Sequence, residues 1–335
     1  MDLGQLFGLG WEVPADLPEA AGSDKLAETI DEWKLLRAFG LVLITLILSG
    51  YMNVGQMTNI TYACFRATIQ LTVLSSILVP IFKMEYWWLV SLYLLFMVFV
   101  GAHAVRGRPR YAYKGMFAHI FLVMLLIPVP IVLGTIAFII QTWPFWEAQY
   151  AIPLSGMALG NTLAGLSLGL DSVLNDLKQG RGYIELMLAA GATRTEACYQ
   201  CMKDAALVAM TPQISSLTVI GVVSIPGMMT GQILGGSSPE QAARYQLVVM
   251  FMILSSVCLS VVSVAYLCII TIVDSDGVLD TQKIARQEKA KGDLIATLVQ
   301  SAGRTLWSGL VKLSKCFTRS PRPQDVAEDE EPLLP

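Results

Sequence analysis

The sequence predicts an all-α, polytopic membrane protein with about seven transmembrane helices, its N-terminus outside and its C-terminus in the cytosol. Hydrophobic residues make up 54% of the 335-residue chain and charged residues only 15%, and the mean hydropathy is +0.58. This composition excludes an ordinary soluble protein. The apolar residues fall in stretches long enough to cross a bilayer, and Lys and Arg gather in alternate loops.

Each predicted span can cross a hydrocarbon core of about 30 Å at about 1.5 Å per helical residue. The spans lie near residues 36–53, 65–82, 86–104, 116–140, 151–170, 213–235 and 245–273. The fourth contains Pro128 and Pro130. Because proline removes a helical N–H and clashes with the preceding turn, this span is expected to kink.

The basic residues give the orientation, since cytosolic loops of membrane proteins are enriched in Lys and Arg. The loops after the third and fifth spans are basic, whereas the candidate outer loops hold only Lys83 and Arg244. The basic residues of the two inner loops are Arg106, Arg108, Arg110, Lys114, Lys178, Arg181, Arg194 and Lys203. This alternation places the N-terminus outside and the C-terminus inside.

Three regions follow from the spans. Residues 1–35 form an acidic, flexible leader without the pattern of a cleaved signal peptide, so we expect it to remain on the mature chain. Residues 36–273 form the seven-span membrane domain, with a cytosolic hairpin over 171–212, and residues 274–335 form a cytosolic tail. The six cysteines lie in apolar spans or cytosolic segments, so no disulfide is expected.

The tail carries two patterns. Residues 293–317 have apolar side chains at three- and four-residue spacing with basic residues close behind, which predicts an amphipathic helix on the inner leaflet or, as the alternative, packed against protein. Asp329 lies four residues before Leu333 and Leu334, the spacing of an acidic dileucine sorting signal. Such a signal predicts a eukaryotic chain in an endosomal or vacuolar membrane; the plasma membrane is the alternative.

Two apolar segments are interrupted by polar residues, Gly or Pro. Pro226 and Gly227 break the sixth span, Asn161 interrupts the fifth, and in hydrocarbon a broken backbone is tolerated where protein buries it or where it lines a watery cavity. Candidate pathway residues are therefore Asn161, Pro226, Gly227, Met228, Met229, Thr230 and Gln232. The alternatives are a proline kink that only shapes packing, and polar side chains that hold helices together.

The hairpin between the fifth and sixth spans contains two predicted helices, over 172–190 and 194–208, separated by Gly191, Ala192 and Thr193. The glycine is typical of a helix C-terminal cap, and Thr193 with Glu196 has the spacing of a capping box. A short, rigid corner facing the cytosol follows from this pattern. The alternative is a solvated loop with no docking role.

These segments carry a family resemblance. GYIELMLAAGATRTEACYQ, IPLSGMALGN and IPGMMTGQILGGSSPEQAARYQ resemble the ABC-transporter permeases that include bacterial FetB-type iron exporters and plant aluminium-tolerance permeases, over roughly residues 36–273. By this resemblance, the segment that couples the permease to its ATPase contains Glu185, Gly191, Ala192, Thr193 and Glu196. The resemblance implies a homodimer with a separate ATPase subunit, and export of iron or another metal cation, metal tolerance, or a sugar-nucleotide cargo.

The sequence is consistent with an ATPase supplied by a partner. It contains no G-x-x-x-x-G-K-[ST] phosphate loop, so we expect no enzyme activity and no bound cofactor of its own, with ATP acting through the partner subunit. The spans lack the buried acids or histidines typical of proton-driven carriers, which disfavours a secondary transporter. A non-transporting membrane scaffold is a further alternative. Membrane lipid is the other expected partner, and nucleic acid is not.

No metal site can be assigned from the sequence. Cys198 and Cys201 are three residues apart on the hairpin, but a closed zinc centre needs four ligands. The sequence assigns no role to these two cysteines, and it identifies neither a bound metal nor the transported substrate.

Overall fold

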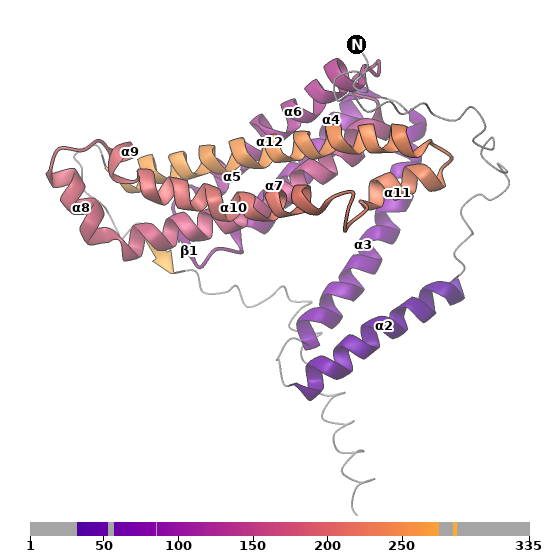
Figure 1. The fold of residues 1–335 in the computed structure, drawn as a ribbon, viewed down its shortest axis with the longest axis horizontal. Helices are drawn as coiled ribbons and strands as arrows, with labels where there is room; N and C mark the ends of the chain where they lie inside the picture. The colour runs from indigo at the N-terminus through magenta and orange to yellow at the C-terminus, as the bar shows by residue number, and fades with distance from the viewer. Residues whose placement is uncertain (1–31, 53–56, 85, 275–283, 287–335) are drawn as a thin grey trace, which may run out of the picture. The chain divides into compact units, whose positions relative to one another are not determined.

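The computed structural model describes residues 32–52, 57–84, 86–274 and 284–286, which are mainly helical (Figure 1). The helices that precede the hairpin are α2 (Glu32–Tyr51), α3 (Met57–Met84), α4 (Trp87–Arg106), α5 (Met116–Leu126), α6 (Pro128–Gly134), a π-helical turn η1 (Thr135–Ile140) and α7 (Ala148–Gln179). The helices that come next are α8 (Arg181–Ala189), α9 (Arg194–Ala197), α10 (Tyr199–Val219), α11 (Gly227–Leu234) and α12 (Pro239–Ile272). The predicted all-α class is confirmed.

The described residues fall into two compact units. The N-terminal unit contains residues 38–76, and the bundle unit contains the chain from Ile77 onward up to Gln287. In the N-terminal unit most apolar side chains are exposed, and the hydroxyls of Thr61, Thr68 and Thr72 donate to the carbonyl four residues earlier. Lipid-facing helices have this character because their polar groups must be satisfied within the helix.

Five described helices are long and apolar enough to cross a membrane. They are Met57–Lys83, Trp87–Arg106, Met116–Ile140, Ala148–Gln179 and Pro239–Ile272, and α2 adds a shorter apolar stretch over Arg37–Tyr51. The chain is therefore a multi-pass membrane protein. The predicted sixth span is divided between α10 and α11, and the count of seven and the orientation stay predictions.

Helix α7 is the centre of the bundle unit, where it packs against α4, α6, α10 and α12. Figure 1 shows α7, α10 and α12 running side by side. Close approach depends on Gly165 and Gly169, because a Cβ at these positions would lie 2.6 Å from Val257 Cγ1 and 2.8 Å from Val261 Cγ1. Small residues four apart let membrane helices pack by van der Waals contact, since burial from lipid supplies no hydrophobic gain.

The fourth span is interrupted next to the prolines at which a kink is predicted. α5 ends at Leu126 and α6 begins at Pro128, with the π-helical turn following directly. Proline at the first position of a helix has no N–H to lose, so Pro128 ends one helix and starts the next. The interruption therefore lies at Ile127.

The predicted limits of the hairpin helices are wrong at the ends farthest from the corner. The helix expected at 172–190 is a continuation of α7 to Gln179, followed by α8, and the helix expected to end at 208 continues in α10 to Val219. Residues 171–179 contain no helix breaker, so α7 continues until Gly180, where a Cβ would lie 2.9 Å from the Asp176 carbonyl oxygen. α10 continues past Pro212 as one helix, and it packs against α7 and α12.

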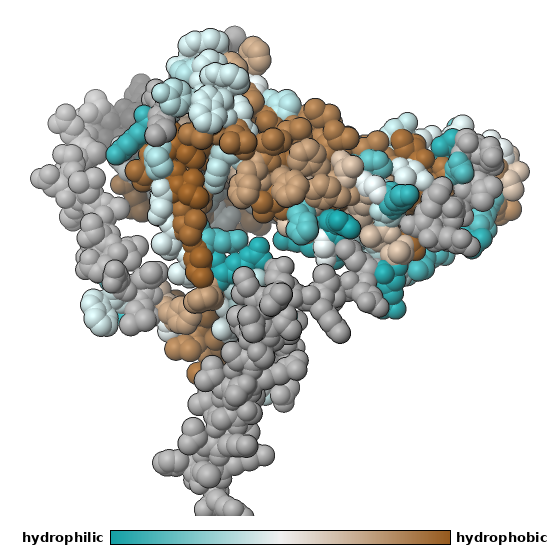
Figure 2. Space-filling view, turned by 180° about the vertical axis from the view of Figure 1, so that it is seen from behind, coloured by the Kyte–Doolittle hydropathy of each residue, from teal (hydrophilic) through white to brown (hydrophobic). Residues whose placement is uncertain are grey.

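The predicted inner loops meet at one end of the bundle unit. Strand β1 (Tyr111–Tyr113), in the loop after α4, pairs antiparallel with β2 (Ile284–Arg286), which follows α12. Seen from behind, hydrophilic side chains gather toward the end that carries the hairpin, and hydrophobic ones cover the helical body (Figure 2). This common location agrees with the assignment of these loops to one side of the membrane.

Candidate functional site

The hairpin corner is built by two consecutive helix caps. At the end of α8 the Gly191 N–H donates to the Leu188 carbonyl at 3.0 Å, and the Ala192 N–H donates to the Met187 carbonyl at 3.1 Å. This pair of bonds is a Schellman motif, which needs a left-handed residue, and Gly191 has φ of 91°. The predicted glycine cap is therefore present.

Immediately after this cap, a capping box starts α9. The Thr193 N–H donates to Glu196 Oε2 at 2.8 Å, and the Glu196 N–H donates to Thr193 Oγ1 at 3.4 Å. The bonds from the Thr193 backbone N–H and then from its hydroxyl lower the pKa of the Glu196 carboxyl below its ordinary 4.5. A lowered folded-state pKa adds stability above the ordinary pKa that is lost as pH falls through the folded one. At neutral pH the corner is thus fully capped.

The same corner is attached to the far end of α12. The Arg194 Nη1 donates to the carbonyl oxygen of Val273 at 3.2 Å, and α9 packs against α12. Val273 is the C-terminal cap of α12 and is completely buried. A cation suits this place because the carbonyls at a helix C-terminus carry partial negative charge.

Large apolar side chains are exposed on the hairpin. Tyr183 is 61% exposed, Leu186 67% and Tyr199 62%, whereas Ile184 on the opposite face of α8 is 1% exposed. Apolar groups at an otherwise hydrophilic end are typical of a protein interaction surface. These three exposed residues were not predicted from the sequence, although the three-residue spacing of Tyr183 and Leu186 on α8 and their polar neighbours could have indicated them.

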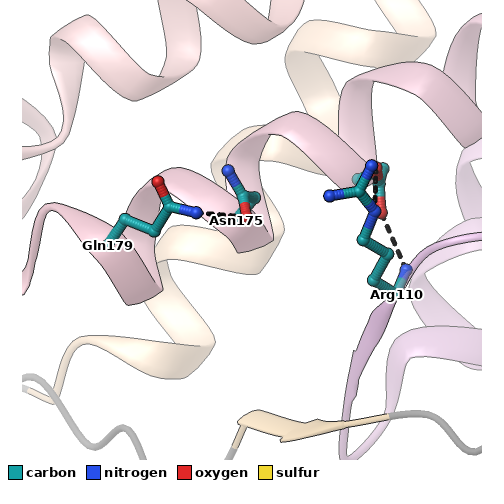
Figure 3. Close-up of polar contacts among 4 residues, drawn as sticks. Arg110, Asn175 and Gln179 are labelled. Atoms are coloured by element: carbon teal, nitrogen blue, oxygen red, sulfur yellow. Dashed lines mark hydrogen bonds and ion pairs between the residues drawn. The ribbon is translucent and has the colours of Figure 1, made fainter.

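Polar contacts fix the base of the hairpin on the neighbouring loop (Figure 3). The Arg110 N–H donates to Asp171 Oδ1 at 2.7 Å, and Arg110 Nε lies 3.6 Å from Asp171 Oδ2. Two turns further along α7, Gln179 Nε2 donates to Asn175 Oδ1 at 3.0 Å. The Lys178 ammonium lies 4.3 Å from the centre of the Tyr111 ring. Within α8, Arg181 and Glu185 form an ion pair at 2.6 Å.

The break in the predicted sixth span is a true interruption of the helix. α10 ends at Val219 and α11 begins at Gly227; between them Gly221 has φ of 80° and its N–H donates to the Ser224 carbonyl at 2.9 Å. Pro226 is extended and caps α11. The segment is therefore a break between two helices and not a kink within one, and its role in a pathway or in packing alone stays a prediction.

The structure brings the predicted pathway residues together only in part. Asn161 Nδ2 donates to the Met157 carbonyl at 2.8 Å, and Gln213 Nε2 on α10 donates to Asn161 Oδ1 at 2.9 Å. Gln213 was missed because it lay at the edge of the predicted span. No hydrogen bond between Asn161 and α11 occurs within the described ranges.

The α11 residues have mixed surroundings. Thr230 is exposed and its hydroxyl donates to the Pro226 carbonyl at 3.2 Å, while Gln232 and Met229 are half-buried. Met228 packs against the hydrophobic core, which agrees with a filling role. Gly227 is exposed, and a Cβ added there would meet no atom within 4 Å in the described part of the chain.

Cysteines at the hairpin carry free thiols. Cys198 and Cys268 are buried and Cys201 is half-buried, and burial raises the pKa of the Cys198 thiol to about 12. Burial thus favours the neutral thiol of Cys198 over the thiolate. Among the described residues, no three His, Cys, Asp or Glu side chains gather in a way that could hold a metal ion.

The predictions for the two ends lie outside the described residues. They comprise most of the leader, the amphipathic helix at 293–317 and the sorting signal Asp329, Leu333 and Leu334.

Residues 32–273 match the family described as Uncharacterised protein family (UPF0014). The chain is 31% identical over 237 residues to Protein ALUMINUM SENSITIVE 3 of Arabidopsis thaliana, which covers 69% of this chain and 83% of that protein. It is 33% identical over 226 residues to UPF0014 membrane protein YjkA of Bacillus subtilis, and this match covers 68% of this chain and 89% of that protein.

A third relative is the Probable iron export permease protein FetB of Escherichia coli, 29% identical over 245 residues, covering 72% of this chain and 92% of that protein. These matches confirm the resemblance predicted from the motifs. No solved structure gives a significant match.

Proposed function

The chain belongs to the UPF0014 family of membrane proteins, and from this premise we propose that it is the membrane-spanning permease subunit of an ABC-type transporter. The observation that carries the proposal is the doubly capped corner at Gly191 and Thr193, exposed at the hydrophilic end of the bundle. A partner ATPase supplies the ATP site, and this chain binds no cofactor itself.

The corner is suited to dock a partner because it is rigid before binding. The Schellman motif and the capping box satisfy the free backbone groups of both helix ends, so little conformational entropy remains to be lost. Tyr183 and Leu186 provide apolar contact area beside it. Glu185 pairs with Arg181 within α8, and Ala192 packs half-buried against the core beside the corner.

A second copy of the chain is proposed to cover α10. Between Thr211 and Val219 the helix exposes four hydroxyl side chains, Thr211, Ser215, Ser216 and Thr218, together with Pro212 and Ile214. α10 has 21 residues and is therefore long enough to cross a membrane. Unlike the candidate spans of the bundle, it is too polar to be counted as a membrane-crossing helix. The Thr211 and Thr218 hydroxyls donate to the Leu207 and Ile214 carbonyls of α10 itself. The proposed contact therefore relies on Ser215 and Ser216, since small hydroxyl side chains let membrane helices pack closely and bond to one another.

The transport pathway is proposed to follow this face toward the break before α11. Asn161 and Gln213 offer amide groups, and Thr230 and Gln232 offer further oxygen atoms beyond Pro226 and Gly227. The proposed cargo is iron or another metal cation, in line with the printed name of the Escherichia coli relative. A sugar nucleotide is the alternative cargo.

The test is capture of the ATPase by the tagged chain in detergent, with mass spectrometry of the bound subunits. Gly191→Val is expected to weaken capture about tenfold, because an L side chain in the left-handed region costs roughly 1–2 kcal/mol and misplaces α9. A Cβ at Gly191 meets no atom within 4 Å, so the effect comes from the backbone alone.

Gly182→Val is the matched control, because Gly182 lies on the exposed face of α8, has open space around it and has no positive φ. It is expected to capture the ATPase as the wild type does. Should the wild type retain no nucleotide-binding subunit, a secondary transporter or a non-transporting scaffold would be the better account.

A further inference from the structure

A hydrogen bond between described residues joins the proposed docking corner directly to helix α12. Arg194 is the first residue of α9, directly after the capped corner, and its guanidinium donates to the Val273 carbonyl, 79 residues further along the chain. Arg194 is half-buried, so this bond is partly shielded from water. Hydrogen bonds from a charged donor are stronger than neutral ones.

Helix α12 extends from this bond to the opposite end of the bundle. It has 34 residues from Pro239 to Ile272 and packs against α5, α7, α10 and α11. At its start, Ser238 caps it by accepting from the Gln241 N–H at 3.3 Å. The turn before it connects to α11, where the Ser237 N–H donates to the Gln232 carbonyl at 3.0 Å.

We propose that Arg194 is a positioning residue that transmits movement of the docking corner to α12, and through α12 to α11. The inference rests on the proposed function, since the corner moves only if an ATPase binds it. A displacement of the corner pulls on the last turn of α12, and a packed helix transfers that displacement along its length rather than absorbing it. The opposite end of α12 adjoins the turn that follows α11 at Gly235 and Gly236. Gly236 has φ of 94°, so the backbone can turn there.

Loss of the Arg194 side chain should affect transmission to α12, whereas loss of a docking-surface side chain should affect binding of the ATPase. The Schellman motif and the capping box do not use the Arg194 side chain, so the corner keeps its shape without the guanidinium. Binding of the ATPase is therefore expected to survive in Arg194→Ala. Transmission to α11 is expected to fail.

The experiment places a fluorescent amino acid at Ser237, which is exposed in the turn between α11 and α12. The full-length chain with its ATPase subunit is reconstituted into vesicles, and the change in fluorescence on adding ATP is measured together with the amount of ATPase retained. Wild-type chain is expected to show an ATP-dependent change. Arg194→Ala is expected to retain the ATPase within about twofold while the fluorescence change falls at least about fivefold, the lower range of measured coupling between sites.

Two further variants complete the design. Arg194→Lys keeps a cation at the C-terminus of α12 and is expected to retain part of the change. Arg108→Ala removes an exposed arginine from the same end that lies outside the Arg194–Val273 bond, and it is expected to behave as wild type.

The outcomes separate the two proposals. A wild type that retains no ATPase overturns the proposed function and this inference with it. Retained ATPase with an undiminished fluorescence change in Arg194→Ala overturns the inference alone. Loss of ATPase from Arg194→Ala also overturns it, because Arg194 would then be part of the docking surface.

Discussion

At the scale of single residues, the amides of Asn161 and Gln213 form a hydrogen bond between two helices of the bundle. This 2.9 Å bond joins α7 to the part of α10 that also carries Thr211 and Ser215. Such a pair can hold helices together, line a route for a solute, or do both. The two roles predict different effects on transport when the amides are removed.

We expect Asn161→Ala and Gln213→Ala each to lower the free energy of unfolding by about 1 kcal/mol or less, the usual value for hydrogen bonds between membrane helices. The double variant should cost less than the sum of the two, because the second change removes a partner that is already lost. If the pair lines the pathway, ATP-dependent uptake of iron into inside-out vesicles should fall more than about tenfold in both single variants. Unchanged uptake beside lowered stability would leave the pair with a structural role only.

Sequence reasoning identified Asn161 but not its partner. An asparagine inside an apolar segment is conspicuous, whereas Gln213 follows Pro212 at a position that the hydropathy pattern marks as a span boundary. Only the packing of α10 against α7 shows that it lies beside Asn161. The caps at Gly191 and Thr193 were predictable because capping depends on local spacing alone.

At the scale of elements, the bundle depends on close contact of α7 with α10 and α12. A Cβ at Gly165 would lie 2.6 Å from Val257 Cγ1 and 3.7 Å from the Ala209 carbonyl oxygen. We expect Gly165→Ala to lower the free energy of unfolding by roughly 1–3 kcal/mol, the usual cost of an overpacked core. The change is measured by thermal unfolding in detergent, with loss of the monodisperse peak in size-exclusion chromatography as the readout.

Removing the atom that clashes should restore part of that loss. The double variant Gly165→Ala with Val257→Ala is expected to be more stable than the sum of its single changes predicts. Gly160→Ala is the control, since Gly160 is exposed and has nothing within 4 Å of a Cβ. Equal losses from Gly160→Ala and Gly165→Ala would show that close approach at Gly165 is not what matters.

Helix existence was easier to predict than helix limits. Hydropathy located the apolar centres of the spans, and Pro128 indicated where the fourth is interrupted. It could not show that α7 and α10 extend beyond the apolar part, because a polar helical extension and a separate polar helix have the same composition. Gly180 and the packing of α10 determine where those helices end.

At the scale of the whole molecule, the orientation rests on the basic loops. Their meeting at one end is supported by the Arg110–Asp171 pair, the Arg194–Val273 bond and the β1–β2 pairing. In a cysteine-less background, a cysteine at Gly107 should be labelled from the cytosol and one at Ser238 from outside. Both positions are exposed, so accessibility does not bias the result. Labelling of both from one side would rule out the proposed arrangement.

Binding of an ATPase at the hairpin corner is the proposal on which transport by this chain depends. A photoreactive amino acid at Thr195, next to the capping box, tests it most directly, with Phe138 as the control because it is exposed and belongs to the apolar segment after α6. We expect irradiation in intact membranes to join Thr195, and not Phe138, to a subunit whose sequence contains a phosphate-binding loop. A Thr195 position that forms no such adduct, or forms it no more often than Phe138 does, would contradict the docking role of the corner.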